Sequence, residues 1–138
     1  MNFPSNDVRT VAAYYFSSLS ADFDEAVERT TEALKREGFG IITEIDVQQT
    51  LKKKINVDFR PYRILGACNP ALAHEALKLE DKVGTMLPCN VIVQAASRGQ
   101  VEVAAIDPVA SMKAIENPAL LESARVIRSK LEKVINSL

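Results

Sequence analysis

The chain of 138 residues is 47% hydrophobic and 25% charged, a composition typical of one soluble globular domain. Its formal net charge of -1 provides no long-range attraction for nucleic acid or for an anionic membrane surface, so neither partner is expected. Residues 1–8 lack the features of a signal peptide, and no apolar run approaches the roughly 18 residues that a membrane span requires. We therefore expect a cytoplasmic protein.

Hydrophobic periodicity predicts an alternation of strands and helices. Segments in which apolar residues alternate or run together predict strands, and segments in which they recur at steps of three and four predict helices. In chain order these are a strand at 9–19, a helix at 22–37, a strand at 39–46, a helix at 47–55, a strand at 62–68, a helix at 70–79, strands at 89–96 and 100–106, a short helix starting at 108, and a long helix at 118–138.

Capping signals support the starts of these helices. Asp22 and Asp46 are each followed three residues later by Glu or Gln, the spacing of a capping box. Three further helices begin with an Asn-Pro or Asp-Pro pair, at residues 69, 107 and 117. In these pairs the first side chain accepts a bond from the free backbone donors, and proline suits the first helical position.

This order of elements predicts an α+β domain spanning residues 1–138. We expect a flexible segment at 1–8, a core at 9–112 and a C-terminal helix at 118–138. The core is expected to be a single-layer mixed sheet of about five strands, covered by helices mainly on one face. The helix at 22–37 is a long crossover, which predicts a parallel pair of strands, whereas the last two strands form an antiparallel hairpin.

Four blocks of sequence occur in the order and spacing of a known family. They are GFGIITEID at residues 38–46, ILGACNP at 64–70, LPCNV at 87–91 and DP at 107–108. On these blocks, over about residues 13–112, the chain resembles the bacterial and archaeal domain of unknown function 302 family. The resemblance implies a compact α+β domain that usually stands alone and forms dimers. It implies no catalytic role for the residues of the recurrent blocks, which are Gly38, Gly40, Cys68, Asn69, Pro70, Pro88, Cys89 and Asn90.

Cys68 and Cys89 are the only cysteines, and each precedes an asparagine beside an apolar run. If their two strands are antiparallel neighbours, both thiols lie at one edge of the sheet and could form a dithiol or share a soft metal. If the strands are parallel, the thiols lie about 20 Å apart and cannot act together. Buried, inert thiols are the alternative in either arrangement. Cys68 has the better claim to reactivity, because a helix N-terminus beside it favours thiolate.

Asn69 and Asn90 also have two interpretations. A helix cap and a turn residue explain them structurally, whereas two amides and two thiols at the end of a sheet could converge on a small ligand. Cys68, Asn69, Cys89 and Asn90 are therefore the candidate ligand-binding residues. His74, the only histidine, lies on the polar side of its helix and matches no zinc spacing. No catalytic residue, metal site or cofactor is predicted.

Two functions follow from these features. The first is a non-enzymatic domain that binds a small ligand or a partner and acts as a homodimer. The dimer is expected because Leu121, Val126 and Ile135 add apolar surface to the C-terminal helix beyond its main stripe. The alternative is a thiol-dependent module in which Cys68 and Cys89 handle sulfur, redox equivalents or a soft metal.

Overall fold

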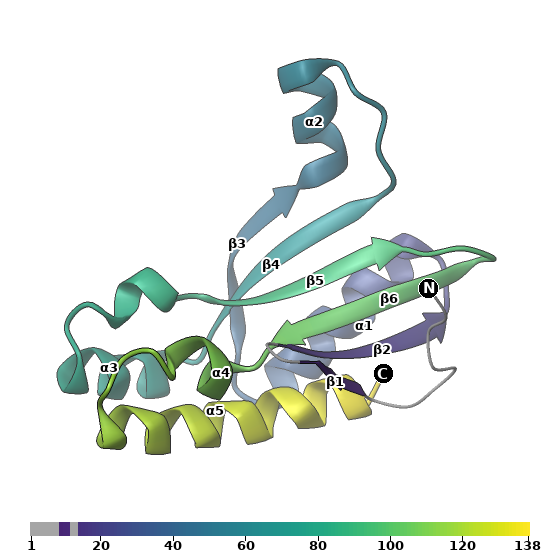
Figure 1. Cartoon of the computed structure of the whole chain (residues 1–138). Helices are drawn as coiled ribbons and strands as arrows, with labels where there is room; N and C mark the ends of the chain where they lie inside the picture. Colours follow the sequence, from purple (N-terminus) through teal and green to yellow (C-terminus); the bar gives the residue numbers. More distant parts are fainter. Residues whose placement is uncertain (1–8, 12–13) are drawn as a thin grey trace.

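A computed structural model describes residues 9–11 and 14–138. The segment at 1–8, which the sequence predicts to be flexible, lies outside this range. Strands and helices alternate along most of the chain (Figure 1). In order they are β1 (Arg9–Val11), β2 (Tyr14–Ser20), α1 (Phe23–Arg36), β3 (Gly40–Asp46), α2 (Val47–Ile55), β4 (Tyr62–Cys68), α3 (Pro70–Leu79), the 3-10 helix η1 (Val83–Met86), β5 (Cys89–Ala95), β6 (Gln100–Ile106), α4 (Pro108–Met112) and α5 (Pro118–Asn136).

The strands form one sheet in the order β1-β2-β6-β5-β4-β3, which confirms the α+β class. The expectation of a mixed sheet is wrong, because every pairing between the described strands is antiparallel. The crossover through α1 does join two strands that run in the same direction. However, β6, β5 and β4 lie between β2 and β3, so the two strands are not neighbours and form no parallel pair.

The single strand expected at residues 9–19 is two strands. β1 and β2 pair antiparallel, with Val11 opposite Tyr14, and residues 12–13 lie outside the described range. The other predicted strands match β3 to β6 closely. The sheet therefore gains a short sixth strand at its edge.

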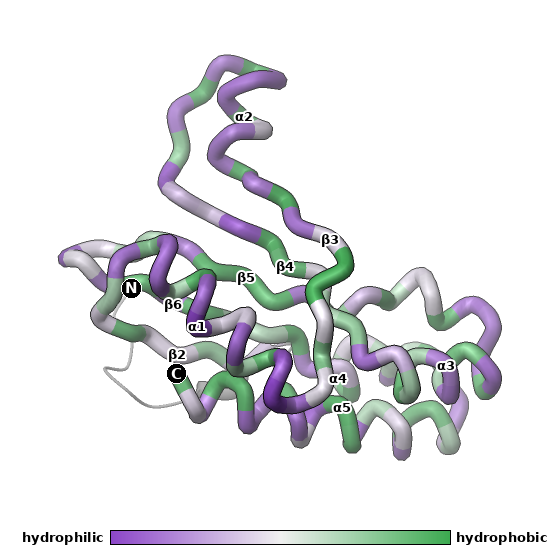
Figure 2. The backbone as a smooth tube through the Cα atoms, turned by 180° about the vertical axis from the view of Figure 1, so that it is seen from behind, coloured by the Kyte–Doolittle hydropathy of each residue, from purple (hydrophilic) through white to green (hydrophobic). Residues whose placement is uncertain are grey.

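Helices cover one face of the sheet, as expected. Figure 2 shows α1 in front of the strands and α5 running below them. α1 packs on β3, β5 and β6, and α5 packs on β2 and β6. The core between them is formed by alternate strand positions, among them Leu65, Val91, Val93, Val103 and Ala105, all of them almost inaccessible to solvent. α3 and α4 pack against α5 and form a second, smaller apolar cluster.

The predicted caps are all present. The side chains of Asp22, Asp46, Asn69, Asp107 and Asn117 each accept a hydrogen bond from a backbone N–H in the first turn of the helix that follows. These bonds satisfy donors that the helix itself leaves free. The sequence therefore sets the point at which five helices begin.

The sequence predicts apolar surface on α5 beyond its main stripe, and the structure buries part of that surface. Ile135 lies in the core at 1% exposure, so its expected place on a free surface is wrong. Leu121 is half-buried, whereas Val126 remains 48% exposed. α5 thus offers little free apolar surface. None of the helices in the described part of the chain is both long and apolar enough to cross a membrane.

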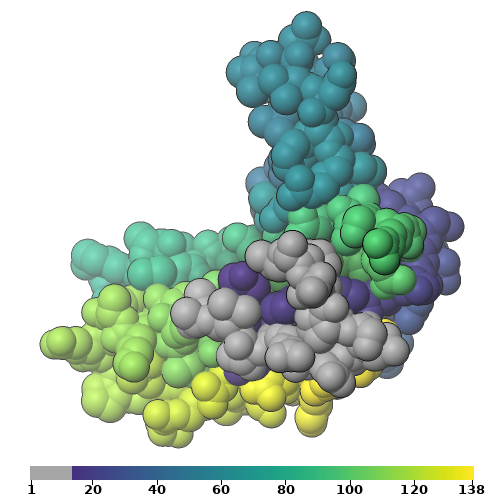
Figure 3. All heavy atoms as spheres, turned by 45° about the vertical axis from the view of Figure 1, so that its right-hand side comes forward, coloured from purple at the N-terminus to yellow at the C-terminus, as the bar shows by residue number. Residues whose placement is uncertain are grey.

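The second half of β3, α2 and the segment leading into β4 project from the body of the domain. We name residues 42–61 the arm. Figure 3 shows its upper part as a column of atoms that rises above the rest of the molecule. None of the nine residues of α2 is buried. Four large apolar side chains of the arm are exposed, namely Ile42, Ile45, Ile55 and Val57. The arm therefore leaves apolar surface without a partner in the described part of the chain.

Candidate functional site

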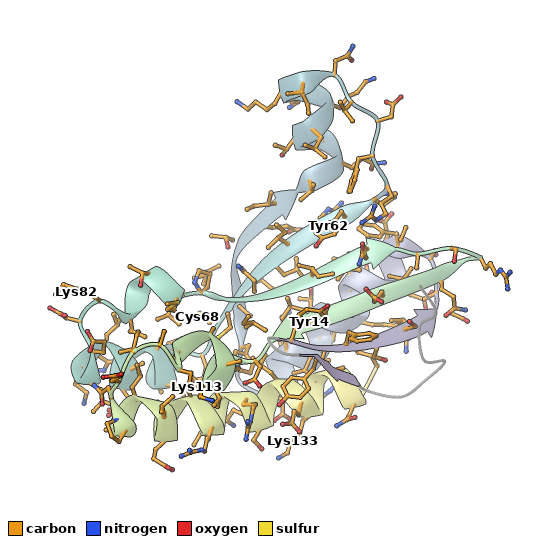
Figure 4. All side chains as sticks on the ribbon, viewed as in Figure 1. Tyr14, Tyr62, Cys68, Lys82, Lys113 and Lys133 are labelled. Carbon is orange, nitrogen blue, oxygen red and sulfur yellow. The ribbon has the colours of Figure 1, made fainter. Side chains whose placement is uncertain are left out.

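The two cysteines lie at the same edge of the sheet. β4 and β5 are antiparallel neighbours in which Ala67 is opposite Cys89, so Cys68 and Cys89 occupy adjoining positions on paired strands. The arrangement that would have separated the thiols is thereby excluded. Both cysteines are free, and Cys68 is half-buried whereas Cys89 is buried. Cys68 is labelled in Figure 4.

Both thiols line a pocket of about 310 Å³ at this edge. Its walls come from Phe39 and Ile42, from α3, from the chain between Gly84 and Cys89, and from α5. Asn69 is the only one of the thirteen lining residues whose side chain carries nitrogen or oxygen. A pocket of this kind favours a small, mainly apolar molecule held by one amide.

Asn69 is held in place by two neighbours. Its Oδ1 accepts a bond of 3.3 Å from the backbone N–H of Leu72, which is the helix cap predicted from the sequence. Its Nδ2 lies 2.9 Å from the position that a Cβ on Gly38 would take, so only glycine leaves this approach open. Gly38 also has a φ of 86°, which side chains disfavour. Asn69 therefore lines the pocket in a fixed position.

Asn90 is the candidate residue that does not join this pocket. Successive side chains of β5 point to opposite faces, so Cys89 points toward the helices whereas Asn90 is exposed on the other face. There it lines a separate hollow with Ile92 and Gln94. The structure thus brings together Cys68, Asn69 and Cys89 and separates Asn90 from them.

Comparisons with known proteins agree with this fold. A family described as "Domain of unknown function DUF302" matches residues 15–138. The chain belongs to the DUF302 family. A solved structure described as an uncharacterised conserved DUF302 protein from Bacillus stearothermophilus is 32% identical to it, with a TM-score of 0.83. That similarity covers 89% of this chain and 95% of the other. No protein of curated function matches the sequence.

The family match of this DUF302 domain includes α5, beyond the range on which the sequence blocks depend. α5 also lines the thiol pocket through Ile127. The C-terminal helix is therefore part of the site as well as of the core.

The chemistry of the thiol pair is set by burial. Burial, with a smaller effect from neighbouring Cys68, raises the pKa of Cys89 to about 11, so this thiol stays protonated at neutral pH. A protonated thiol is a poor nucleophile and a poor metal ligand. His74 is exposed on α3, and the described residues contain no group of three or more His, Cys, Asp or Glu side chains arranged to hold a metal ion.

Sequence reasoning missed one polar residue in this DUF302 domain. Glu102 is 7% exposed in the middle of β6, on the face of the sheet that α1 and α5 do not cover. The signal was present, because Glu102 stands between Val101 and Val103 in a mainly apolar strand. A carboxylate is rarely buried without a partner.

Proposed function

We propose that this DUF302 domain binds a small, mainly apolar molecule in the pocket beside Cys68 and Cys89. The composition of the pocket wall carries the proposal, since Asn69 supplies its only amide among apolar and thiol groups. Apolar pockets with a few placed polar groups are typical of small-molecule sites. In this proposal the domain is a cytoplasmic binding protein and not an enzyme.

The half-exposed rim of the pocket supports access from solvent. Ile42 is 61% exposed and Leu77 is 44% exposed, and both line the pocket. The interior end is closed by Ala76, which is fully buried. A ligand can therefore enter past Ile42 and Leu77 and displace water from an apolar wall, which is favourable.

An NMR titration with 1-hexanol tests this proposal. We expect saturable shifts of the backbone amides around Cys68, Gly84 and Cys89. Ala73→Leu places a larger side chain in the pocket and should abolish these shifts. Ala114→Leu is the matched control, because Ala114 is exposed outside the pocket. Shifts that persist in Ala73→Leu, or that appear elsewhere on the chain, contradict the proposal.

A thiol-dependent function is the competing proposal, and the adjoining positions of Cys68 and Cys89 favour it. The raised pKa of Cys89 opposes it, because reactive thiols need thiolate. Cys68→Ser and Cys89→Ser separate the two functions. Hexanol binding that survives both substitutions supports an apolar pocket in which the thiols act as wall groups.

We also propose that the domain acts as a homodimer and that the arm provides the contact. The support is the exposed apolar surface of Ile45, Ile55 and Val57 on one projecting segment, while Ile42 remains at the pocket entrance. Several exposed apolar side chains on one segment are typical of an interaction surface. A second copy is the partner because symmetric dimers are the commonest assemblies of soluble proteins.

A further inference from the structure

The face of the sheet that α1 and α5 leave open contains a second hollow, of about 380 Å³. It lies across the middle strands, and Tyr14 and Tyr62 on its wall are labelled in Figure 4. Ile92, Ala104 and Ile106 form its apolar floor. This hollow is distinct from the thiol pocket, because its floor residues alternate with those that face the helices.

A row of polar side chains crosses this face at one level. In the register of the sheet, Tyr62 is opposite Gln94, Gln94 is opposite Glu102, and Glu102 is opposite Ser18. Two hydrogen bonds connect part of the row. Arg60 Nε donates to Gln94 Oε1 at 3.0 Å, and Gln94 Nε2 donates to Glu102 Oε1 at 2.8 Å. Gln94 is thereby oriented by Arg60 and in turn orients the carboxylate.

The row ends in two groups without partners. Glu102 Oε2 and Ser18 Oγ are both buried, and neither has a hydrogen-bond partner among the described residues. Glu102 is only 7% exposed and Ser18 only 5% exposed. Buried polar groups without partners are rare in folded proteins and costly. Protonation of Glu102 does not remove the cost of the missing hydrogen bond, because the protonated carboxyl would need an acceptor for its own proton.

Glu102 forms no ion pair among the described residues. Arg60 lowers the pKa of Glu102 only through a weaker electrostatic attraction. Arg60 is the nearest cation of the row, but its bond goes to the amide of Gln94. The guanidinium of Arg60 lies over the rings of Phe59 and Tyr62, with its Cζ 4.4 Å and 5.8 Å from their centroids. The open-face hollow therefore has an unpaired acid at its floor and aromatic rings at its wall.

We propose that this hollow binds a small primary amine whose ammonium group donates to the carboxylate of Glu102, which lines it. The apolar part of the amine then lies on Ile92, Ala104 and Ile106, with Tyr14 and Tyr62 beside it. The ammonium group supplies the donor that Glu102 Oε2 lacks. Charge and shape thus select an amine over a neutral molecule of equal size.

Titration of the full-length protein with benzylammonium chloride, followed by NMR, tests the proposal. We expect saturable shifts of the backbone amides of Ile92, Glu102 and Ala104, and none of these shifts with benzyl alcohol. Glu102→Gln keeps the size of the side chain and removes its charge, so the affinity should fall about tenfold to a hundredfold. Glu122→Gln, on an exposed position of α5, should leave the affinity unchanged.

Two results would overturn the proposal. One is equal binding of benzyl alcohol and benzylammonium, and the other is unchanged affinity in Glu102→Gln. If Glu102→Gln does not fold, Ala104→Leu provides the second measurement, because it fills the floor of the hollow and should weaken benzylammonium binding severalfold. The hollow and the thiol pocket share no lining residue. Ala73→Leu should therefore abolish hexanol binding and leave amine binding intact.

Discussion

The hydroxyl of Thr43 occupies the space that a side chain on Gly66 would need. A Cβ built on Gly66 would lie 2.0 Å from Thr43 Oγ1 and 2.8 Å from Pro88 Cγ. Thr43 and Gly66 are paired across β3 and β4, next to a register shift in β3. Glycine at position 66 therefore allows β3, β4 and the segment before β5 to approach one another closely.

Gly66→Ala should lower the free energy of unfolding by about 1 to 3 kcal/mol, because overpacking forces neighbouring atoms apart. Adding Thr43→Ala should restore part of this loss by removing the nearer clash. Gly84→Ala is the control, since no heavy atom lies within 4 Å of its added Cβ. Urea unfolding measures all three. Equal stability of Gly66→Ala and Gly84→Ala would show that the strands do not approach this closely.

Asn69→Ala should lower the free energy of unfolding by about 0.5 to 2 kcal/mol, because the N–H of Leu72 loses its acceptor. Asn69→Asp keeps an acceptor and should be nearly neutral. Asn117→Ala is a matched comparison at the start of α5, where the amide also donates to the carbonyl of Leu79 at 2.9 Å. Thermal unfolding that is unchanged in Asn69→Ala would show that the amide serves the pocket alone.

Thiol titration of the native protein should label Cys68 first, and Cys89 should react only on unfolding. Burial raises the pKa of Cys89 to about 11, which removes its thiolate at neutral pH, and also limits reagent access. Cys68→Ser should then show no early reaction, whereas Cys89→Ser should keep it. Rapid reaction of both thiols would instead favour the thiol-dependent function.

The stability of the protein should respond to pH through Glu102. Burial raises the pKa of Glu102 above its ordinary value of 4.5, against smaller opposing effects of Gln94 and Arg60. The folded state therefore holds this proton more tightly than the unfolded state. As the pH rises from 4.5 through the raised pKa, loss of this proton costs more in the folded state than in the unfolded state. The free energy of unfolding therefore falls over this interval.

Glu102→Gln removes this titration, so the variant should gain stability relative to the natural protein over that pH interval. Below the interval, the difference between the two proteins should be constant. A series of urea-unfolding measurements across the interval checks the direction. A difference that is constant at every pH would show that Glu102 ionises normally in the folded state.

Sedimentation velocity should show a dimer of the 15.2 kDa chain, and Ile55→Glu should dissociate it without unfolding. Ile55 is 63% exposed on the arm, so a charge there opposes only the contact between copies. Val126→Glu, on the exposed side of α5, should leave the dimer intact. Dissociation by Val126→Glu alone would place the interface on α5. Ile135→Glu should unfold the chain, because Ile135 is buried in the core.

Local signals predicted the elements well because each depends on a few neighbouring residues. Asp22, Asp46 and Asn69 mark helix starts through bonds within one turn, and these bonds are present. Strand order was not predictable in the same way. A helix between β2 and β3 fixes that both strands run in one direction, but it does not fix how many strands are inserted between them.

The sequence predicted the candidate site only in part, because the site depends on the strand order. Cys68, Asn69 and Cys89 meet because β4 and β5 are antiparallel neighbours, an arrangement that the sequence left open. Asn90 was grouped with them by sequence proximity, although the alternation of β5 turns it to the other face. Glu102 and Ser18 come together from strands far apart in the chain, so no local pattern could pair them.

The arm gives the domain two regions of different local stability. The amides of α2 lie on a helix with no buried residue, so opening the arm exposes little additional apolar surface. In hydrogen exchange, α2 should lose its protons to solvent deuterium far sooner than β5 and β6, whose alternate positions form the core. If a second copy covers the arm, its exchange should slow as the protein concentration rises, while exchange in β5 and β6 stays the same. The concentration dependence of the hydrogen-exchange rate in α2 would thus report the assembly of the protein in solution.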